Sequence, residues 1–465
     1  MAELKLQRQL GVWSAASIVV GTVIGSGIFL VPKTMVANTG SAAMVLLVWV
    51  FGGLLSLAGA LTYAEMAAAM PEAGGEYVYL KEAYGPFWGF LFGWTQMWVA
   101  KSGSVATLGS GFALYLANFF PVLDQALFLI PLPIGENWGP LPVNGGQLAA
   151  IALILGLGAL NWFGVREAAG VQVLVTILKV ALIGGVIAAG LLGGKAAVEN
   201  LATSTPAAGG VAGFFAALVA ALWAYDGWNN LSMVSGEITR PQRNLPLALI
   251  AGTAGVMGIY LLTNLAYFSV LPAAEVAASD RVASVMMHAV VGEWGATAVT
   301  VAALISMFAA LNGSLLSGSR IPYAAARDGL FFRRFAEISP KHLTPGFSVL
   351  ALSIWSAALV LSGRYDQLLT MVIFPSWILY GMSAAAVIVL RRKRPDLPRP
   401  YRTLGYPVVP ILFVAVAAAL LLATLQKSPR ESLLGLIVIA SGIPFYQYWS
   451  RRRPERACRG ARTGP

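Results

Sequence analysis

The chain has 465 residues, of which 58% are hydrophobic and only 11% are charged, and its formal net charge is +11. A soluble globular protein of this length would carry about a quarter charged residues, and no polar stretch here is long enough to form a separate soluble domain. The composition therefore excludes an ordinary soluble protein and predicts one all-α membrane domain, because an apolar run of about 20 residues can cross the hydrocarbon core as a helix.

The apolar runs predict twelve membrane-spanning helices. The first is expected to be retained, because no clear small-residue cleavage site follows it. Residues 64–85 predict a connection at the inner face, since Pro71 and the pair Gly74-Gly75 interrupt any helix there. Residues 272–295 predict a short helix at the outer face that acts as a lid. The spans are placed at 12–30, 42–64, 86–118, 147–163, 169–194, 211–235, 247–271, 297–323, 347–363, 368–390, 406–424 and 432–449.

The basic residues predict the orientation of these spans. Of the 31 lysines and arginines, 23 fall on the side that carries both termini and six on the other side. Cytoplasmic loops collect the positive charge in membrane proteins, so both termini are expected in the cytoplasm and the chain in the cell membrane. The net charge then needs only anionic lipid as its partner and gives no reason to expect nucleic acid.

Three glycines interrupt the first span at mid-membrane depth, in the run Val23-Ile24-Gly25-Ser26-Gly27 and at Gly21. A glycine costs about 1 kcal/mol in a helix interior relative to alanine. Helix packing explains Gly21 and Gly25, which share a face, but not Gly27, so an unwound segment is favoured over packing. Its free N–H groups and the following helix dipole favour a carboxylate.

The sixth span is interrupted in the run Trp223-Ala224-Tyr225-Asp226-Gly227-Trp228-Asn229-Asn230. An intramembrane acid is expensive and is a functional candidate by default. The alternative is that Asp226 only caps a half-helix, and both interpretations need a helix break here.

Interrupted spans in corresponding positions of two halves are the best sequence pointer to a transporter site. They predict inverted repeats at 12–194 (helices 1–5) and 211–390 (helices 6–10). Helices 11 and 12 follow at 406–449, and a basic cytoplasmic tail at 450–465. The half-helix N-terminus of the first span would hold an anionic group, and free carbonyls of the sixth span would hold a cationic one. A zwitterionic amino acid matches both.

Two lysines lie well within predicted spans. Lys179 is too deep to reach the interface easily and is expected to face carbonyls freed by the first break, together with a hydroxyl of the eighth span such as Ser306. Its ammonium can stand where a sodium ion would otherwise bind, or it can merely tie helices together. Lys101 is interpreted as a wall or vestibule lysine rather than a direct substrate contact.

Other kinds of chemistry find little support in the sequence. The single cysteine, Cys458, allows no intrachain disulfide, and the nucleotide-binding motif G-x-x-x-x-G-K-[ST] does not occur, so any pumping must use gradients. No nucleophile–base pair or metal-spaced cluster appears in the spans, which argues against an enzyme. His288 and His342 are interpreted as solvated, and neither a metal nor a cofactor is expected.

Several motifs together resemble the amino acid–polyamine–organocation superfamily, and within it the L-type amino acid transporter group. The resemblance runs over nearly the whole chain and implies a five-plus-five inverted-repeat fold (the leucine-transporter type) with alternating access. Its markers are Val20–Phe29; Tyr63-Ala64-Glu65 with Pro71 and Gly74-Gly75-Glu76-Tyr77; Asn161–Lys179; Ala224–Pro246, including Glu237 and Asn244-Leu245-Pro246; Thr263–Phe268; Leu311-Asn312-Gly313-Ser314 with Ser319-Arg320; and Pro395-Asp396-Leu397 with Arg399-Pro400.

The resemblance also implies roles for individual residues. Val23, Ile24, Gly25, Ser26 and Gly27 would hold the α-amino and α-carboxylate groups of an amino acid. Backbone carbonyls in the segment from Trp223 through Ala224, Tyr225 and Asp226 to Gly227 would complete the amine site, and Trp223 would stand as an aromatic gate. Lys179 resembles the fifth-span lysine that links spans 1 and 8 in sodium-independent members.

The sequence departs from the family pattern in three places. Metazoan members join a heavy chain through an outer-loop cysteine, and the lack of one here predicts no disulfide-linked heavy subunit and a bacterial single-chain form resembling alanine-serine-cysteine exchangers. Ala309-Ala310 replace a glycine and a hydroxyl residue, which weakens a sodium site. Trp223 is bulkier than the phenylalanine of many relatives, so a small pocket is expected, with a preference for alanine, serine, glycine or cysteine.

Three other functions remain open from the sequence. A proton-coupled symporter of the same fold would titrate Lys179 or Asp226. A cationic amino acid or polyamine exchanger is disfavoured by one deep acid against two intramembrane lysines. An amino acid sensor usually needs a signalling appendage, and the tail after Ser450 is short.

Overall fold

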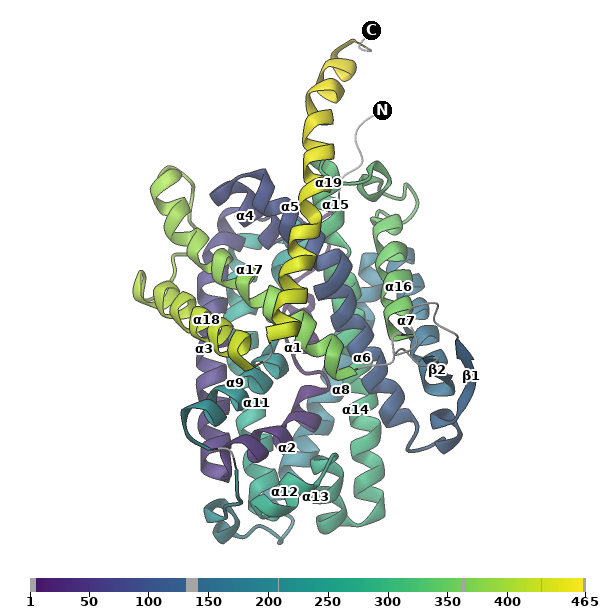
Figure 1. Ribbon diagram of the computed structural model, residues 1–465, viewed down its shortest axis with the longest axis vertical. Coiled ribbons are helices and arrows are strands. Elements are labelled where there is room, and N and C mark those ends of the chain that lie inside the picture. The colour runs from purple at the N-terminus through teal and green to yellow at the C-terminus, as the bar shows by residue number, and fades with distance from the viewer. Residues whose placement is uncertain (1–5, 131–140, 208, 362–364, 428, 463–465) are drawn as a thin grey trace.

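The protein is almost wholly helical (Figure 1). Its computed structural model describes residues 6–130, 141–207, 209–361, 365–427 and 429–462. The helices are α1 (Val12–Val23), α2 (Gly27–Thr39), α3 (Ala42–Ala69), α4 (Glu76–Tyr84), α5 (Pro86–Thr95), η1 (Gln96–Ala100), α6 (Lys101–Leu116), η2 (Pro121–Asp124), α7 (Gly145–Phe163), α8 (Val165–Leu192), η3 (Val198–Ala202), α9 (Gly210–Tyr225), α10 (Asn230–Met233), η4 (Ser235–Glu237), α11 (Pro241–Val270), α12 (Ala273–Ala278), α13 (Val282–Val291), α14 (Glu293–Gly318), α15 (Arg320–Arg327), η5 (Arg333–Ala336), α16 (Gly346–Val360), α17 (Tyr365–Lys393), α18 (Val408–Lys427) and α19 (Pro429–Arg462).

Within the described residues, nine helical stretches are long and apolar enough to cross a membrane. They coincide with nine of the predicted spans. The three others are interrupted or short: 86–118 becomes α5, η1 and α6; 211–235 becomes α9 and α10; and 347–363 becomes α16. The end predicted for the ninth span, at residue 363, falls within 362–364, outside the described residues.

Both predicted breaks interrupt a helix. The first lies between the end of α1 at Val23 and the start of α2 at Gly27. In the second, Asp226 adopts an extended conformation after α9, and Gly227 follows with a φ of 106°. Only glycine adopts such a φ without strain, so Gly227 lets the chain turn before α10 begins at Asn230.

The third predicted span contains a widened turn. Residues Gln96–Ala100 form a π-helix between α5 and α6. Such a turn accommodates one extra residue in an otherwise continuous helix and is frequent at functional sites. Lys101 is the first residue of α6 after this turn.

The connections differ in detail from the sequence expectation. α3 continues to Ala69 before the predicted turn, and α4 follows it as a short helix. The segment at 272–295, predicted at the outer face, forms two helices, α12 and α13, at the end of the molecule opposite both termini, while α4 and α15 lie toward the termini (Figure 1). The sequence analysis did not predict the antiparallel hairpin of β1 (Ala126–Ile130) and β2 (Leu141–Asn144). α19 extends to Arg462, where only a tail was predicted.

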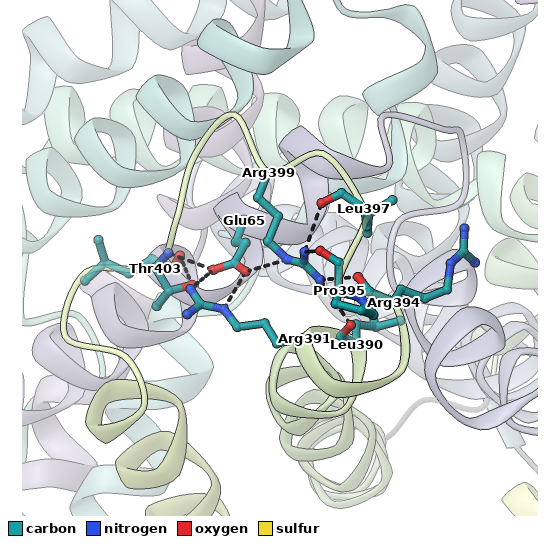
Figure 2. Close-up of polar contacts among 9 residues, drawn as sticks. Glu65, Leu390, Arg391, Arg394, Pro395, Leu397, Arg399 and Thr403 are labelled. Carbon is teal, nitrogen blue, oxygen red and sulfur yellow. Dashed lines mark hydrogen bonds and ion pairs between the residues drawn. The ribbon is translucent and has the colours of Figure 1, made fainter.

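Two ion-pair groups, each around a buried glutamate, join distant segments. Arg320 donates to both carboxylate oxygens of Glu237 at 2.7 and 3.1 Å, and neither side chain is exposed. Near the C-terminal end of α3, Glu65 accepts from Arg391 and from the backbone N–H of Thr403, and it also pairs with Arg399 (Figure 2). These contacts fix α3 to the end of α17 and to the segment that follows it.

Candidate functional site

A small cavity lies between the two helix breaks. Its volume of about 30 Å³ is room for two or three water molecules, since a single one needs roughly 10–15 Å³. The lining combines backbone of both broken helices with side chains from α6 and α14. The residues are Thr22, Val23, Gly25, Ser26, Gly27, Ser104, Leu108, Trp223, Ala224, Asp226, Gly227, Asn230 and Ser314.

Close packing brings the two breaks together. A Cβ atom added to Gly27 would lie 2.5 Å from the Cβ of Ala224, and one added to Gly25 would lie 3.1 Å from Leu108. Contacts this short require glycine at position 27. The sequence interpretation that packing does not explain Gly27 is therefore wrong, because the partner lies on a helix nearly 200 residues away and is invisible to local spacing.

One tyrosine reaches both breaks. The Tyr260 hydroxyl, from α11, lies 2.9 Å from the carbonyl oxygen of Val23 and 2.9 Å from that of Ala224. Thr22 also crosses between the breaks, since its hydroxyl lies 3.0 Å from the carbonyl oxygen of Gly227. The carbonyls at the ends of α1 and α9, which lack helical partners of their own, are thereby held in fixed positions around the cavity.

Lys179 occupies the position expected of it. Its ammonium, fully buried on α8, donates to the carbonyl oxygens of Gly21 at 2.7 Å and of Ile24 at 2.5 Å. Ser306 of α14 donates to Ile24 at 2.9 Å and lies 3.2 Å from the carbonyl oxygen of Gly25. Lys179 and Ser306 therefore meet at the carbonyl of Ile24 rather than through a direct bond. The buried amine of Lys179 thereby satisfies carbonyls that the first helix break leaves without helical partners.

Asp226 and Trp223 both face the cavity. One carboxylate oxygen of Asp226 accepts from the hydroxyl of Tyr380 on α17 at 3.0 Å. The indole of Trp223 is 8% exposed and forms part of the wall. A carboxylate at the wall can attract a cationic group, while the indole limits the room available to a side chain.

The other predicted site residues divide into two groups. Val23, Gly25, Ser26, Gly27, Ala224 and Gly227 line the cavity, whereas Ile24 and Tyr225 do not. The hydroxyl of Tyr225 donates instead to the carbonyl of Trp49 on α3, at 3.1 Å. Lys101 lies behind the wall, where its ammonium donates to the side chain of Asn230 at 2.6 Å.

The sequence reasoning missed five lining residues: Thr22, Ser104, Leu108, Asn230 and Ser314. Thr22 and Asn230 adjoin the predicted breaks and could have been included by widening each segment by one turn. Ser104 and Leu108 carry no local signal, and Ser314 stands only in a marker motif of the family resemblance, without a role in the site. In the described part of the chain, no group of three or more His, Cys, Asp or Glu residues could hold a metal ion.

Comparisons with known proteins agree over most of the chain. A family model described as amino acid permease matches residues 10–442. The human b(0,+)-type amino acid transporter 1 is 34% identical over 447 residues, 95% of this chain and 88% of the relative. The serine/threonine exchanger SteT of Bacillus subtilis (strain 168) is 32% identical over 451 residues, covering 96% and 98%. The human large neutral amino acids transporter small subunit 2 is 32% identical over 461 residues, covering 96% and 82%.

Proposed function

Since the chain belongs to the amino acid permease family of the amino acid–polyamine–organocation superfamily and is similar to its L-type transporters, we propose that it exchanges small neutral L-amino acids across the cell membrane. The members it resembles are transporters rather than enzymes. Alanine, serine, glycine and cysteine are the proposed cargo. The exchange runs by alternating access, needs no sodium, and is performed by a single chain without a disulfide-linked heavy subunit.

The proposed architecture has twelve spans in a five-plus-five inverted repeat. The nine long apolar helices would be joined by the interrupted pairs α5–α6 and α9–α10 and by α16. Helices 1–5 (12–194) and 6–10 (211–390) form the repeats, helices 11 and 12 follow, and both termini lie in the cytoplasm. The two breaks support this arrangement, because each falls in the first helix of its five.

The observation that carries the proposal is the cavity between the breaks. In it, the N-terminus of α2 would hold the substrate carboxylate through first-turn N–H groups. The carbonyls at the end of α9, with Asp226 beside them, would hold the amine. The small volume of the whole cavity, about 30 Å³, and the Trp223 wall favour a substrate with a small side chain. The similarity to a serine/threonine exchanger supports the same size class.

Lys179 supports independence from sodium. Its ammonium touches the carbonyls of Gly21 and Ile24 and would supply the positive charge that a sodium ion supplies in coupled transporters. Because this charge belongs to the protein, it does not cross the membrane with the substrate. A sodium gradient would therefore not drive transport.

The test is uptake of radiolabelled alanine into proteoliposomes in sodium-free buffer at fixed pH. We expect uptake into vesicles preloaded with unlabelled alanine and little into empty ones. Lys179→Ala should abolish exchange, because it leaves the first break without its cation. Lys195→Ala removes an exposed lysine beyond α8 and serves as the matched control. Equal uptake into empty vesicles under an imposed proton gradient would favour a symporter instead.

A cationic amino acid exchanger is the second candidate, because Asp226 lines the cavity. Competition decides between the two. If excess arginine or lysine displaces labelled alanine as well as serine does, and Asp226→Asn removes that competition, the cargo class is wider than proposed. If leucine or tryptophan enters faster than alanine at equal concentration, the small-substrate assignment is wrong.

A further inference from the structure

A second buried polar cluster lies behind the cavity wall, where α4 meets the broken sixth span. Glu76 is the first residue of α4 and its side chain is fully buried. Its carboxylate accepts a hydrogen bond from the side-chain amide of Asn229 and lies 3.2 Å from the hydroxyl of Ser232. A Cβ atom at Gly75 would lie 2.5 Å from that hydroxyl, so the start of α4 is pressed against α10.

Two further charged groups belong to this cluster. Lys101 of α6 interacts electrostatically with both Glu76 and Asp226, and it donates to Asn230. Three tyrosines also face these groups: Tyr63 from α3, Tyr79 from α4 and Tyr380 from α17. They contribute hydroxyl groups and no positive charge. In the described cluster one ammonium therefore serves two carboxyl groups.

This imbalance has a physical consequence. A single ammonium can neutralise one carboxylate, and a second buried carboxylate without a counter-charge is expensive. Burial accordingly raises the pKa of Glu76 from its ordinary 4.5 to about 7, against the lowering effect of its hydrogen bonds and of Lys101. The neutral acid removes the excess negative charge without moving any helix.

The cluster can satisfy Glu76 in both of its charge states. With the amide as placed, Asn229 donates to the carboxylate, and its own buried carbonyl oxygen has no hydrogen-bond partner among the residues that the structure describes. A half-turn of the amide exchanges the two atoms, so that this oxygen accepts from the O–H of neutral Glu76. Asn229 thus serves the carboxylate as a donor and the acid as an acceptor.

A route for the proton lies next to Glu76. A cavity of about 390 Å³ is lined by Ala73, Tyr77 and Val78, close neighbours of Glu76 in the chain, together with Arg8, Lys81 and Asp328. Part of its lining comes from α4 and α15, which lie toward the end of the molecule that carries both termini (Figure 1). Water in this cavity would accept the proton as the O–H bond of Glu76 breaks, and the electron pair would stay on the carboxylate.

We propose that Glu76 binds and releases a proton during the transport cycle, and that its ionisation loosens α4 from α10 and so opens the inner passage to the substrate cavity. When Glu76 is neutral, the cluster has no net charge and α4 stays seated. When it is ionised, the cluster holds two carboxylates and one ammonium, and the demand of the buried Glu76 carboxylate for water favours separation of the two helices. This inference rests on the proposed exchange function and adds its regulation by internal pH.

The experiment measures alanine exchange in preloaded proteoliposomes while the pH on the side of the termini is varied. We expect the rate to rise about tenfold between about pH 6 and pH 8, because the ionised fraction of a group with a pKa of about 7 changes by that factor. Glu76→Gln, which is permanently neutral, should be slow and independent of pH. Glu76→Asp keeps a titratable carboxyl and should retain the dependence with a shifted midpoint.

The outcomes separate this inference from the proposed function. If the wild type and Glu76→Gln both exchange alanine with identical pH profiles, the proposed role of Glu76 is wrong, and the proposed exchange function stands. No alanine exchange at any pH would instead contradict the proposed function. If Glu76→Gln does not fold, a Glu76→Asp profile identical to that of the wild type overturns the inference.

Discussion

Glu65 and Glu76 are buried glutamates eleven residues apart, yet their surroundings are opposite. Glu65 meets two guanidinium groups and a backbone N–H (Figure 2). Glu76 meets an amide and a hydroxyl, and shares its cation with Asp226. An excess of positive partners fixes a carboxylate in its charged state, whereas a shortage leaves it free to change. The first arrangement, Glu65 with Arg391, Arg399 and Thr403, holds two segments together and is called the joint below. The second, Glu76 with Asn229, Ser232 and Lys101, can change its protonation state and is called the switch.

Removing the carboxylate of the joint should produce the largest loss of stability. Glu65→Ala leaves Arg391 and Arg399 without their counter-charge and Thr403 without its acceptor. We expect the free energy of unfolding to fall by about 4 kcal/mol, as for other broken buried pairs. Thermal unfolding in detergent measures it. The matched control is Glu82→Ala, whose pair with Arg394 is partly exposed and should lose less than about 1 kcal/mol. Equal losses would contradict the distinction.

The protonation of Glu76 should make the free energy of unfolding depend on pH. The pKa of Glu76 is raised to about 7, so the folded state keeps a proton that the unfolded chain has released. The free energy of unfolding of the wild type should therefore fall as pH rises from about 4.5 to about 7, by about 3 kcal/mol relative to Glu76→Gln. Chemical denaturation of both proteins across this range tests it, and parallel curves would refute the assignment.

The geometry of the joint should matter as well as its charge. Arg391 makes two parallel hydrogen bonds to Glu65, at 2.9 and 2.7 Å, and its guanidinium lies 3.6 Å from the ring centre of Tyr406. Arg391→Lys keeps the charge but loses the paired geometry and the stacking, for an expected loss of about 1–2 kcal/mol. Arg392→Lys, at the exposed neighbouring position, should change little. A similar midpoint of thermal unfolding for both variants would rule out the geometric contribution.

An exposed pair supplies the smallest expected effect. Lys33 of α2 contacts Asp280, between α12 and α13, at 2.6 Å, and their side chains are 38% and 85% exposed. The hydrogen bond from Lys33 lowers the pKa of Asp280 below its ordinary 3.8. Its contribution is therefore present above that value and is lost as the pH falls further.

We expect Asp280→Asn to cost less than about 1 kcal/mol at neutral pH and nothing measurable in molar salt. The free energy of unfolding measured at low and high salt checks it. A loss that persists at high salt would mean that pairing alone, without burial, stabilises this fold.

The sequence predicted those features that depend on residue types within one short segment of the chain. Glycines and an acid within apolar runs located both helix breaks, and a lysine too deep to reach water was expected to meet free carbonyls. These predictions succeed because each depends on the cost of placing one residue type in a helix within a membrane.

The rest of the site depends on register between distant helices. Tyr260 reaches the two breaks from α11, and Glu76 finds Asn229 more than 150 residues away. The close approach of Gly27 to Ala224 has the same origin. Spacing along the chain fixes the face that a residue occupies on its own helix, but it does not fix which residue of another helix lies opposite.

The π-helical turn at Gln96–Ala100 has a consequence for chain length. Because this turn absorbs one extra residue, a homologue with one residue fewer here would have an ordinary helix, and the helix on either side would keep its register. Lys101 would still face Asn230. The widened turn therefore lets the length of the chain change inside a span without moving a buried lysine. An alignment gap in this stretch would not by itself mean that the contact is lost.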